Sequence, residues 1–161
     1  MKLTRPAVLL GTLPALALAL APSAALASHG QDRGHDVIRA DLTPSLPTDD
    51  PINMVAPGGA PWQIDRGEVR VRPNGRMDVR IEGLKVTRPD GSADNPVPMI
   101  DAVLYCSGRL TADSGPHQLT VPGGDAEFRV RLGALSGCAD ASVLISPSTA
   151  VGHLFIASPV D

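Results

Sequence analysis

The sequence predicts an all-β protein, an immunoglobulin-like β-sandwich of about seven short strands. From Pro61 onward, apolar residues recur with the period of two that is typical of strands, and no window of helical length shows a period of 3.6. Turn residues separate these short runs along the chain. A small closed barrel would produce the same pattern and is the alternative.

Residues 1–27 have the pattern of a secretory signal peptide. Two basic residues precede an apolar run over 7–21, and Ala25 and Ala27 supply the small side chains expected before a cleavage point. The apolar run is interrupted by glycine and proline and is shorter than a bilayer span. We therefore expect cleavage after Ala27, secretion, and no membrane insertion of the mature chain.

Removal of residues 1–27 would leave a mildly acidic chain. Two of the 14 Lys and Arg residues and none of the 17 Asp and Glu residues lie in that segment, so the remaining 134 residues carry a net charge of −5. Nucleic acid and anionic membranes both favour a basic surface, so we expect neither as a partner. This length allows one domain with a modest core.

Residues 28–60 are rich in proline, glycine, aspartate and threonine. Prolines exclude a helix and interrupt any strand ladder, so we predict an extended or partly disordered arm before the domain at 61–161. Within the arm, the alternation of Ile38, Ala40 and Leu42 could add an edge strand to the domain.

The turn Pro73-Asn74-Gly75 joins the two strands of a hairpin whose register can be predicted. A two-residue Asn-Gly turn would place apolar side chains opposite charged ones. A three-residue turn with Gly75 in the left-handed region instead pairs Val71 with Met77 and Val69 with Val79. On the outer face, that register also pairs opposite charges: Arg70 with Asp78, Glu68 with Arg80, and Arg66 with Glu82.

A second clear strand covers residues 125–132, where Ala126, Phe128, Val130 and Leu132 alternate with charged residues. The remaining strand candidates cover residues 62–64, 100–109, 117–121, 141–146 and 153–157.

Cys106 and Cys138 are the two cysteines of the chain. An even count in an exported protein indicates a disulfide. This bond would either join the two sheets or tie a loop to a strand, and closing a loop of about 33 residues is worth about 3.5–4 kcal/mol in the loop-entropy model. A catalytic cysteine would leave an odd thiol, and a metal site would need ligands that no nearby spacing supplies.

No motif predicts a metal or cofactor. The histidines are too scattered for a local metal motif and are interpreted as solvated: His29, His35, His117 and His153. The segment 90–95 has oxygen-bearing side chains but not the spacing of an EF-hand loop, so we interpret it as a Pro-Asp-Gly turn.

No nucleophile elbow, His-Glu-x-x-His pair or phosphate-binding glycine loop is present in the sequence, and we expect a non-catalytic protein. Four acids could supply a carboxylate pair for a hydrolase: Asp65, Glu68, Glu82 and Asp101. Five outward arginines interleave with acids and are interpreted as a solvated face: Arg70, Arg72, Arg80, Arg129 and Arg131.

Trp62 is the one tryptophan in a chain with only three other aromatic residues of the Phe and Tyr types. Sugar-binding modules of this architecture usually stack sugar rings on exposed aromatic side chains. So few aromatics cannot both fill a core and build such a platform, so we expect Trp62 to be buried.

Several segments resemble a family of short secreted actinobacterial proteins over most of the chain after residue 27. They are Asp41-Leu-Thr-Pro-Ser-Leu-Pro47, PGGAPWQIDRGEVRVRPNGRMDVRIEGL from Pro57 to Leu84, NPVP from Asn95, and LYC at Leu104–Cys106. The resemblance implies secretion, one domain and the disulfide, and it carries over no functional site.

The leading functional hypothesis is a secreted, non-catalytic domain that binds a protein or a cell-surface component. The long loop at 87–98 is the best candidate contact surface, because functional loops extend from rigid scaffolds. The alternatives are a secreted hydrolase that uses a carboxylate pair, and a carbohydrate-binding module.

Overall fold

The computed structural model describes residues 35–159. These residues form strands and no helix, which confirms the all-β class. Within that range, accordingly, no apolar helix of membrane-spanning length occurs. The predicted signal peptide at 1–27, its cleavage after Ala27, and His29 lie outside the described residues.

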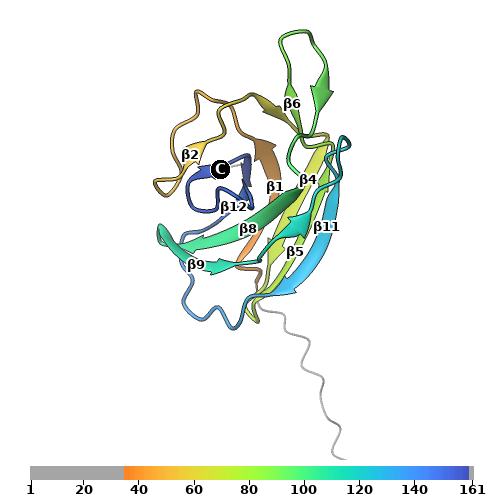
Figure 1. Cartoon of the computed structure of the whole chain (residues 1–161). Helices are drawn as coiled ribbons and strands as arrows, with labels where there is room; N and C mark the ends of the chain where they lie inside the picture. Colours follow the sequence, from red (N-terminus) through yellow and green to blue (C-terminus); the bar gives the residue numbers. More distant parts are fainter. Residues whose placement is uncertain (1–34, 160–161) are drawn as a thin grey trace, which may run out of the picture. The chain divides into compact units, whose positions relative to one another are not determined.

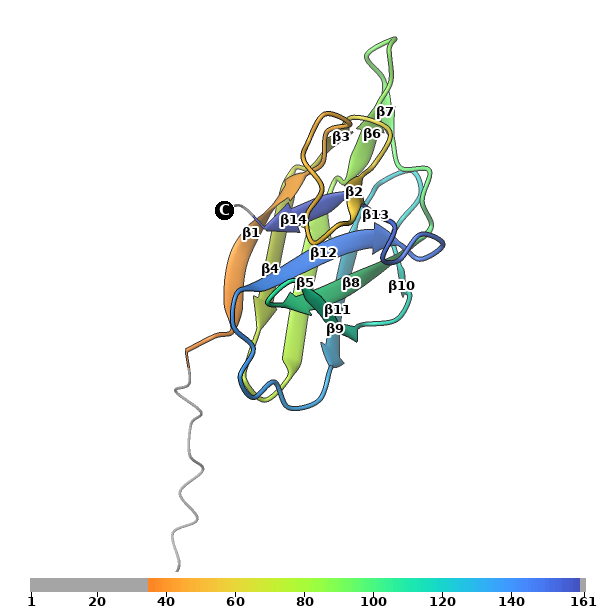
Figure 2. The ribbon, with the colours of Figure 1, turned by 90° about the vertical axis from the view of Figure 1, so that its left-hand side faces the viewer.

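Nine antiparallel strands form one curled sheet (Figure 1). In order across the sheet they are β10 (His117–Gln118), β8 (Met99–Cys106), β12 (Ala141–Pro147), β14 (Ala157–Pro159), β1 (Ile38–Pro44), β4 (Arg66–Val71), β5 (Arg76–Glu82) and β11 (Ala126–Arg131), with β9 (Arg109–Asp113) also paired to β8. The curl places β8 and β12 across from β4 and β5, as both views of the ribbon show (Figures 1 and 2).

Two smaller sheets complete the described chain. The first contains β3 (Trp62–Gln63), β6 (Lys85–Thr87) and β7 (Ala93–Asp94), and the second pairs β2 (Ala56–Pro57) in parallel with β13 (Leu154–Phe155). The β6–β7 hairpin extends beyond the main sheet in both views (Figures 1 and 2).

Strand β1 hydrogen-bonds to both halves of the curled sheet. Its first residues, 38–41, pair with β4, and its last residues, 42–44, pair with β14. The prediction of an edge strand at this position is therefore wrong, since β1 lies inside the sheet. The immunoglobulin-like sandwich is not confirmed, because the hydrogen-bonded path runs without interruption from β10 to β11.

The predicted hairpin register is confirmed at every position. Val71 lies opposite Met77 and Val69 opposite Val79, and all four side chains are buried. Gly75 has a φ of +78°, and its amide donates to the carbonyl of Arg72 at 2.8 Å. This geometry is the expected three-residue turn with a left-handed glycine.

The outward charges of this hairpin do not make the ion pairs that their opposite positions suggest. Arg70 binds Asp36, which precedes β1, at 2.9 Å, and Arg80 binds Glu82 of its own strand at 3.0 Å. Long arginine side chains reach past the residue directly opposite, so register alone does not determine their partners.

The other predicted strands are present, with two corrections. The candidate at 100–109 contains a two-residue turn at Ser107 and Gly108, both with positive φ, which ends β8 and starts β9. The candidate at 153–157 divides into β13 and β14, which pair with different strands.

The core fills the space between the two halves of the sheet. It is built from the inward residues of β4, β5, β8 and β12, and includes Trp62, which is 7% exposed as expected for a buried indole. Gly58 makes room for this indole, because a Cβ there would lie 2.8 Å from its Nε1 atom. A second apolar cluster covers the outer side of β8 and β12: Val55, Val103, Tyr105, Leu144 and Phe155.

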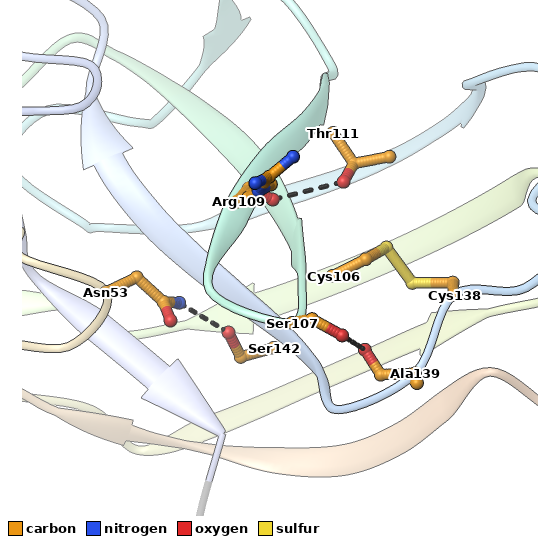
Figure 3. Close-up of a disulfide and its surroundings, with 8 residues drawn as sticks. All are labelled: Asn53, Cys106, Ser107, Arg109, Thr111, Cys138, Ala139 and Ser142. Carbon is orange, nitrogen blue, oxygen red and sulfur yellow. Dashed lines mark hydrogen bonds between the residues drawn. A yellow bond between two sulfur atoms is a disulfide. The ribbon is translucent and has the colours of Figure 1, made fainter.

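The predicted disulfide between Cys106 and Cys138 is present (Figure 3). Cys106 ends β8, whereas Cys138 lies in the connection from β11 to β12, with a Cα–Cα distance of 5.1 Å. Beside it, the Ser107 hydroxyl donates to the carbonyl of Ala139 at 3.3 Å. Of the two expected roles, the bond therefore takes the second and ties a loop to a strand.

We expect the unreduced protein to contain no free thiol. Replacing both Cys106 and Cys138 by alanine should lower the free energy of unfolding by about 2–5 kcal/mol, because the unfolded chain regains the entropy of the closed loop. Thiol titration of denatured, unreduced protein tests the first statement, and urea unfolding tests the second. The reduced parent is the matched control. A double variant as stable as the oxidised parent would contradict the prediction.

The close packing of β1 against its neighbour β4 should tolerate no side chain at Gly67. A Cβ there would lie 2.7 Å from Leu42 Cβ and 2.6 Å from Ile64 Cδ1. Gly67→Ala should therefore lower the free energy of unfolding by about 1–3 kcal/mol. The matched control is Gly59→Ala, where a Cβ would have no neighbour within 4 Å, and a change below about 1 kcal/mol is expected. Equal values for the two variants in urea unfolding would contradict this prediction.

Candidate functional site

On β1, β4, β5 and β11, every second side chain points to the outer surface, and the side chains between them point into the core. Since strand side chains alternate between faces, burial of Val69, Val71, Met77 and Val79 forces the residues between them outward. We call this surface the arginine face. Its charged residues are Arg39, Asp41, Arg66, Glu68, Arg70, Arg72, Arg76, Asp78, Arg80, Glu82, Glu127, Arg129 and Arg131.

The strand register sorts these charges into cross-strand rows instead of mixing them evenly. Nearest the hairpin turn lies a row of three arginines: Arg72, Arg76 and Arg131. The next row holds Arg39, Arg70, Asp78 and Arg129. These two rows form the basic end of the face. The row after them, the acidic row, holds Asp41, Glu68, Arg80 and Glu127.

Asp78 lies at the centre of the basic end and accepts hydrogen bonds from three guanidinium groups. Arg72 Nη1 is 2.7 Å from its Oδ2 atom, Arg76 Nε is 3.3 Å from Oδ1, and Arg129 also donates to Oδ1. Partial burial alone would raise the pKa of Asp78, but the hydrogen bond from Arg129 and the charges of Arg72 and Arg76 hold it below its usual value.

The basic end keeps an excess of positive charge after its internal ion pairs are formed. Six arginines face three carboxylates: Asp78, Asp36, which binds Arg70, and Glu68 of the acidic row, which lies 3.4 Å from Arg39. The side chains of Arg39 and Arg129 are each 64% exposed, so their guanidinium groups are accessible to a partner from solvent. Exposure of these side chains agrees with the predicted solvated face, and the register adds that the basic and acidic residues are unevenly distributed over it.

A shallow hollow of about 510 Å³ lies on the arginine face. Residues of both the basic end and the acidic row line it, with Val79 and Phe128 contributing the apolar part. The charged residues of the hollow are Arg70, Arg72, Arg80, Arg129, Glu68, Asp78 and Glu127. The arrangement therefore provides an open depression in which guanidinium groups can donate several hydrogen bonds to an anion.

The four carboxylates predicted from the sequence are not brought together as a pair in one cleft. Glu68 lines the hollow and lies 3.4 Å from Arg39, whereas Glu82 binds Arg80. Asp65 lies beside Gly83 at the start of β4. Asp101 is on β8, in the other half of the sheet.

Asp101 is only 3% exposed, and its Oδ2 atom has no hydrogen-bond partner among the described residues. Burial raises the pKa of this carboxyl; the Ser148 hydroxyl beside it offsets part of the rise, and the charge of Asp113 adds to it. A carboxyl held away from solvent cannot reach a polymeric substrate. The sequence pattern did not predict that Asp113 lies near Asp101, because the predicted strand at 100–109 ran through the turn that brings β8 and β9 together.

His117 does not have the solvated environment that we expected. Its ring stacks on Phe128 with 3.8 Å between the ring centroids, and its Nε2 atom is buried. The contact joins β10 to β11, the two strands at the ends of the curled sheet. Residues 35–159 contain no group of three or more His, Cys, Asp or Glu side chains arranged to hold a metal ion.

The loop at 87–98 forms the β6–β7 hairpin. Asp90 accepts from the Ser92 amide and hydroxyl at 2.9 and 2.7 Å, as in the predicted turn, while Asp94 is bound by Arg88 at 2.8 Å. Asn95 is 1% exposed and donates to the carbonyls of Val97 and Thr120. The base of this loop is therefore fixed to the domain.

No protein-family model, curated protein or solved structure matches the chain.

Replacing Asp101 by asparagine should change how stability depends on pH. Because the pKa of Asp101 is raised on folding, its favourable contribution is complete below the unfolded value of about 3.9 and is lost as pH rises through the folded value. The parent should therefore lose stability relative to Asp101→Asn as the pH rises from about 4 towards neutrality, as measured by urea unfolding. The exposed Asp50→Asn variant is the control. A constant difference between parent and Asp101→Asn across this range would contradict the prediction.

Proposed function

We propose that this protein is secreted and acts by binding a cell-surface component or a protein through the arginine face. The observation that carries the proposal is the basic end, where six arginines face three carboxylates beside an open hollow. Guanidinium groups that remain partly exposed after their internal ion pairs are formed can bind an anionic partner at a modest cost in desolvation.

Secretion is supported by the signal-peptide pattern at 1–27 and by a disulfide, which persists in an oxidising compartment. A rigid β domain, with a sandwich-like core between two halves of one sheet, supports a binding function because it fixes the spacing of surface side chains. No cofactor is part of the proposal.

Binding through the charged side chains is favoured over hydrolysis at Asp101 and over sugar stacking on Trp62 by the positions of these two residues. A hydrolase that used Asp101 would need a carboxyl that substrate can reach, and this one is buried. A carbohydrate-binding module that stacked sugar on Trp62 would need an exposed indole, and Trp62 is 7% exposed. The β6–β7 hairpin is a second surface that could contribute contacts.

Retention of cell-envelope material by the immobilised protein tests the proposal. We expect the parent to retain envelope polymer or protein, and the double variant Arg129→Gln/Arg131→Gln to lose most of it, because both changes lie at the basic end. The matched control is Lys85→Gln/Arg109→Gln, which removes the same charge from β6 and β9, outside the arginine face, and should behave as the parent.

Equal retention by the two double variants would refute the arginine face as the binding surface. Turnover by the parent in an esterase, glycosidase and protease panel, abolished by a change in Glu68 or Glu127, would replace binding with hydrolysis.

A further inference from the structure

We propose that the ligand of the basic end is a linear acidic polysaccharide whose carboxylates lie across the strands of the arginine face. This inference rests on the function proposed above and names the class of its partner. It is carried by the row geometry, by the charge excess, and by the position of Asp78 among three guanidinium groups.

The rows run across neighbouring strands, which lie about 4.7–4.9 Å apart in a sheet. Arg72, Arg76 and Arg131 occupy three successive strands or strand ends in one row, and a second row with three further arginines runs parallel to it. A chain extended perpendicular to the strands therefore passes a guanidinium group at nearly every strand. A small anion would contact only part of one row, so the arrangement suits a polymer.

The chemistry of the face favours carboxylate as the repeating anion. Its arginines already bind carboxylates: Asp36 with Arg70, and Asp78 with Arg72 at 2.7 Å. Asp78 thus shows, within the protein, the contact that a uronate carboxylate would make with the same donors. Because this one carboxylate serves three guanidinium groups, positive charge is left for a ligand, and Asp78 competes with that ligand for hydrogen bonds.

The acidic row limits where the polymer can lie. Asp41, Glu68 and Glu127 would repel an anionic chain on that side. Burial of the core residues on the other face fixes the strand register, so these acids stay in their row. The polymer is thereby confined to the basic end, on the side of the face near the Pro73–Gly75 turn.

Titration with polygalacturonate oligomers tests the inference by calorimetry, with dextran as the neutral polymer and polyphosphate as the other anionic source. We expect the parent to bind polygalacturonate, and the affinity to fall steeply between about 50 and 300 mM salt because the contacts are ionic. Arg129→Gln/Arg131→Gln should weaken binding roughly tenfold, whereas Lys85→Gln/Arg109→Gln, outside the arginine face, should bind within about twofold of the parent.

Asp78→Asn gives the sharpest readout, because its two expected effects have opposite signs. Loss of the shared carboxylate should make the free protein less stable at neutral pH and should strengthen polygalacturonate binding several-fold. A purely structural Asp78 would lower stability without improving the affinity, which would overturn its assignment as an internal competitor. If Asp78→Asn does not fold, Asp36→Asn removes the second internal carboxylate and should also strengthen binding.

The outcomes separate this inference from the proposed function. Binding of polyphosphate without polygalacturonate, or equal binding of dextran, would overturn the acidic polysaccharide. The acidic polysaccharide would also be overturned if no polyanion bound while envelope material was still retained through Arg129 and Arg131; the proposed function would then stand with a different partner. Retention that is indifferent to both double variants would end the proposed function itself.

Discussion

The pairing of β1 with both halves of the sheet is the constraint on which the rest of the structure depends. Residues 38–41 bond to β4 and residues 42–44 bond to β14, so one short strand turns two sets of strands into a single curled sheet. The change of partner occurs where Leu42 packs against Gly67, the position at which β4 offers no side chain. On the far side of the core, the stacking of His117 on Phe128 brings the two ends of the sheet together. Between these two connections, the inward residues of β4, β5, β8 and β12 share one core.

This core also determines the charge pattern on the outside. A strand that slipped by one residue would exchange its inward and outward sets, so burial of the apolar residues fixes which charged residues face solvent. The register then places arginines opposite arginines near the hairpin turn and acids around Arg80 two rows away. The basic end and the acidic row are consequences of hydrophobic register, and no flexible loop is needed to assemble them. A ligand that binds there meets donors whose spacing already exists, which lowers the entropic cost of binding.

Local sequence patterns predict the elements that depend on neighbouring residues and miss those that depend on distant partners. The hairpin register follows from the agreement of two faces, apolar and charged, and the disulfide follows from an even cysteine count in a chain that starts with a signal-peptide pattern. The role of β1 cannot be read in the same way, because an alternating strand looks alike whether one or two neighbours pair with it. The Ser107-Gly108 turn is hidden inside an apolar run, and without it Asp113 cannot be placed near Asp101.

For the arginine face, the residues are evident from the sequence, but their alternation with acids along each strand suggests neutralisation. The uneven distribution of charge becomes visible only when β11 is paired with β5, because that pairing places Arg131 opposite Arg76.

Net charge is a poor guide to the partners of a protein whose charges are sorted in this way. The chain has 14 basic and 17 acidic residues, which argues on average against anionic ligands. At short range, however, screening limits each charge to neighbours within about 10 Å at ordinary ionic strength, so a ligand at the basic end is influenced mainly by the residues around Asp78. There, three guanidinium groups share one carboxylate, and the lowered pKa of Asp78 has the direction expected of an environment that favours a negative charge. The same environment that stabilises Asp78 as an anion would stabilise an external carboxylate. The local arrangement of arginines, and not the net charge of the chain, therefore determines which ligands this surface can bind.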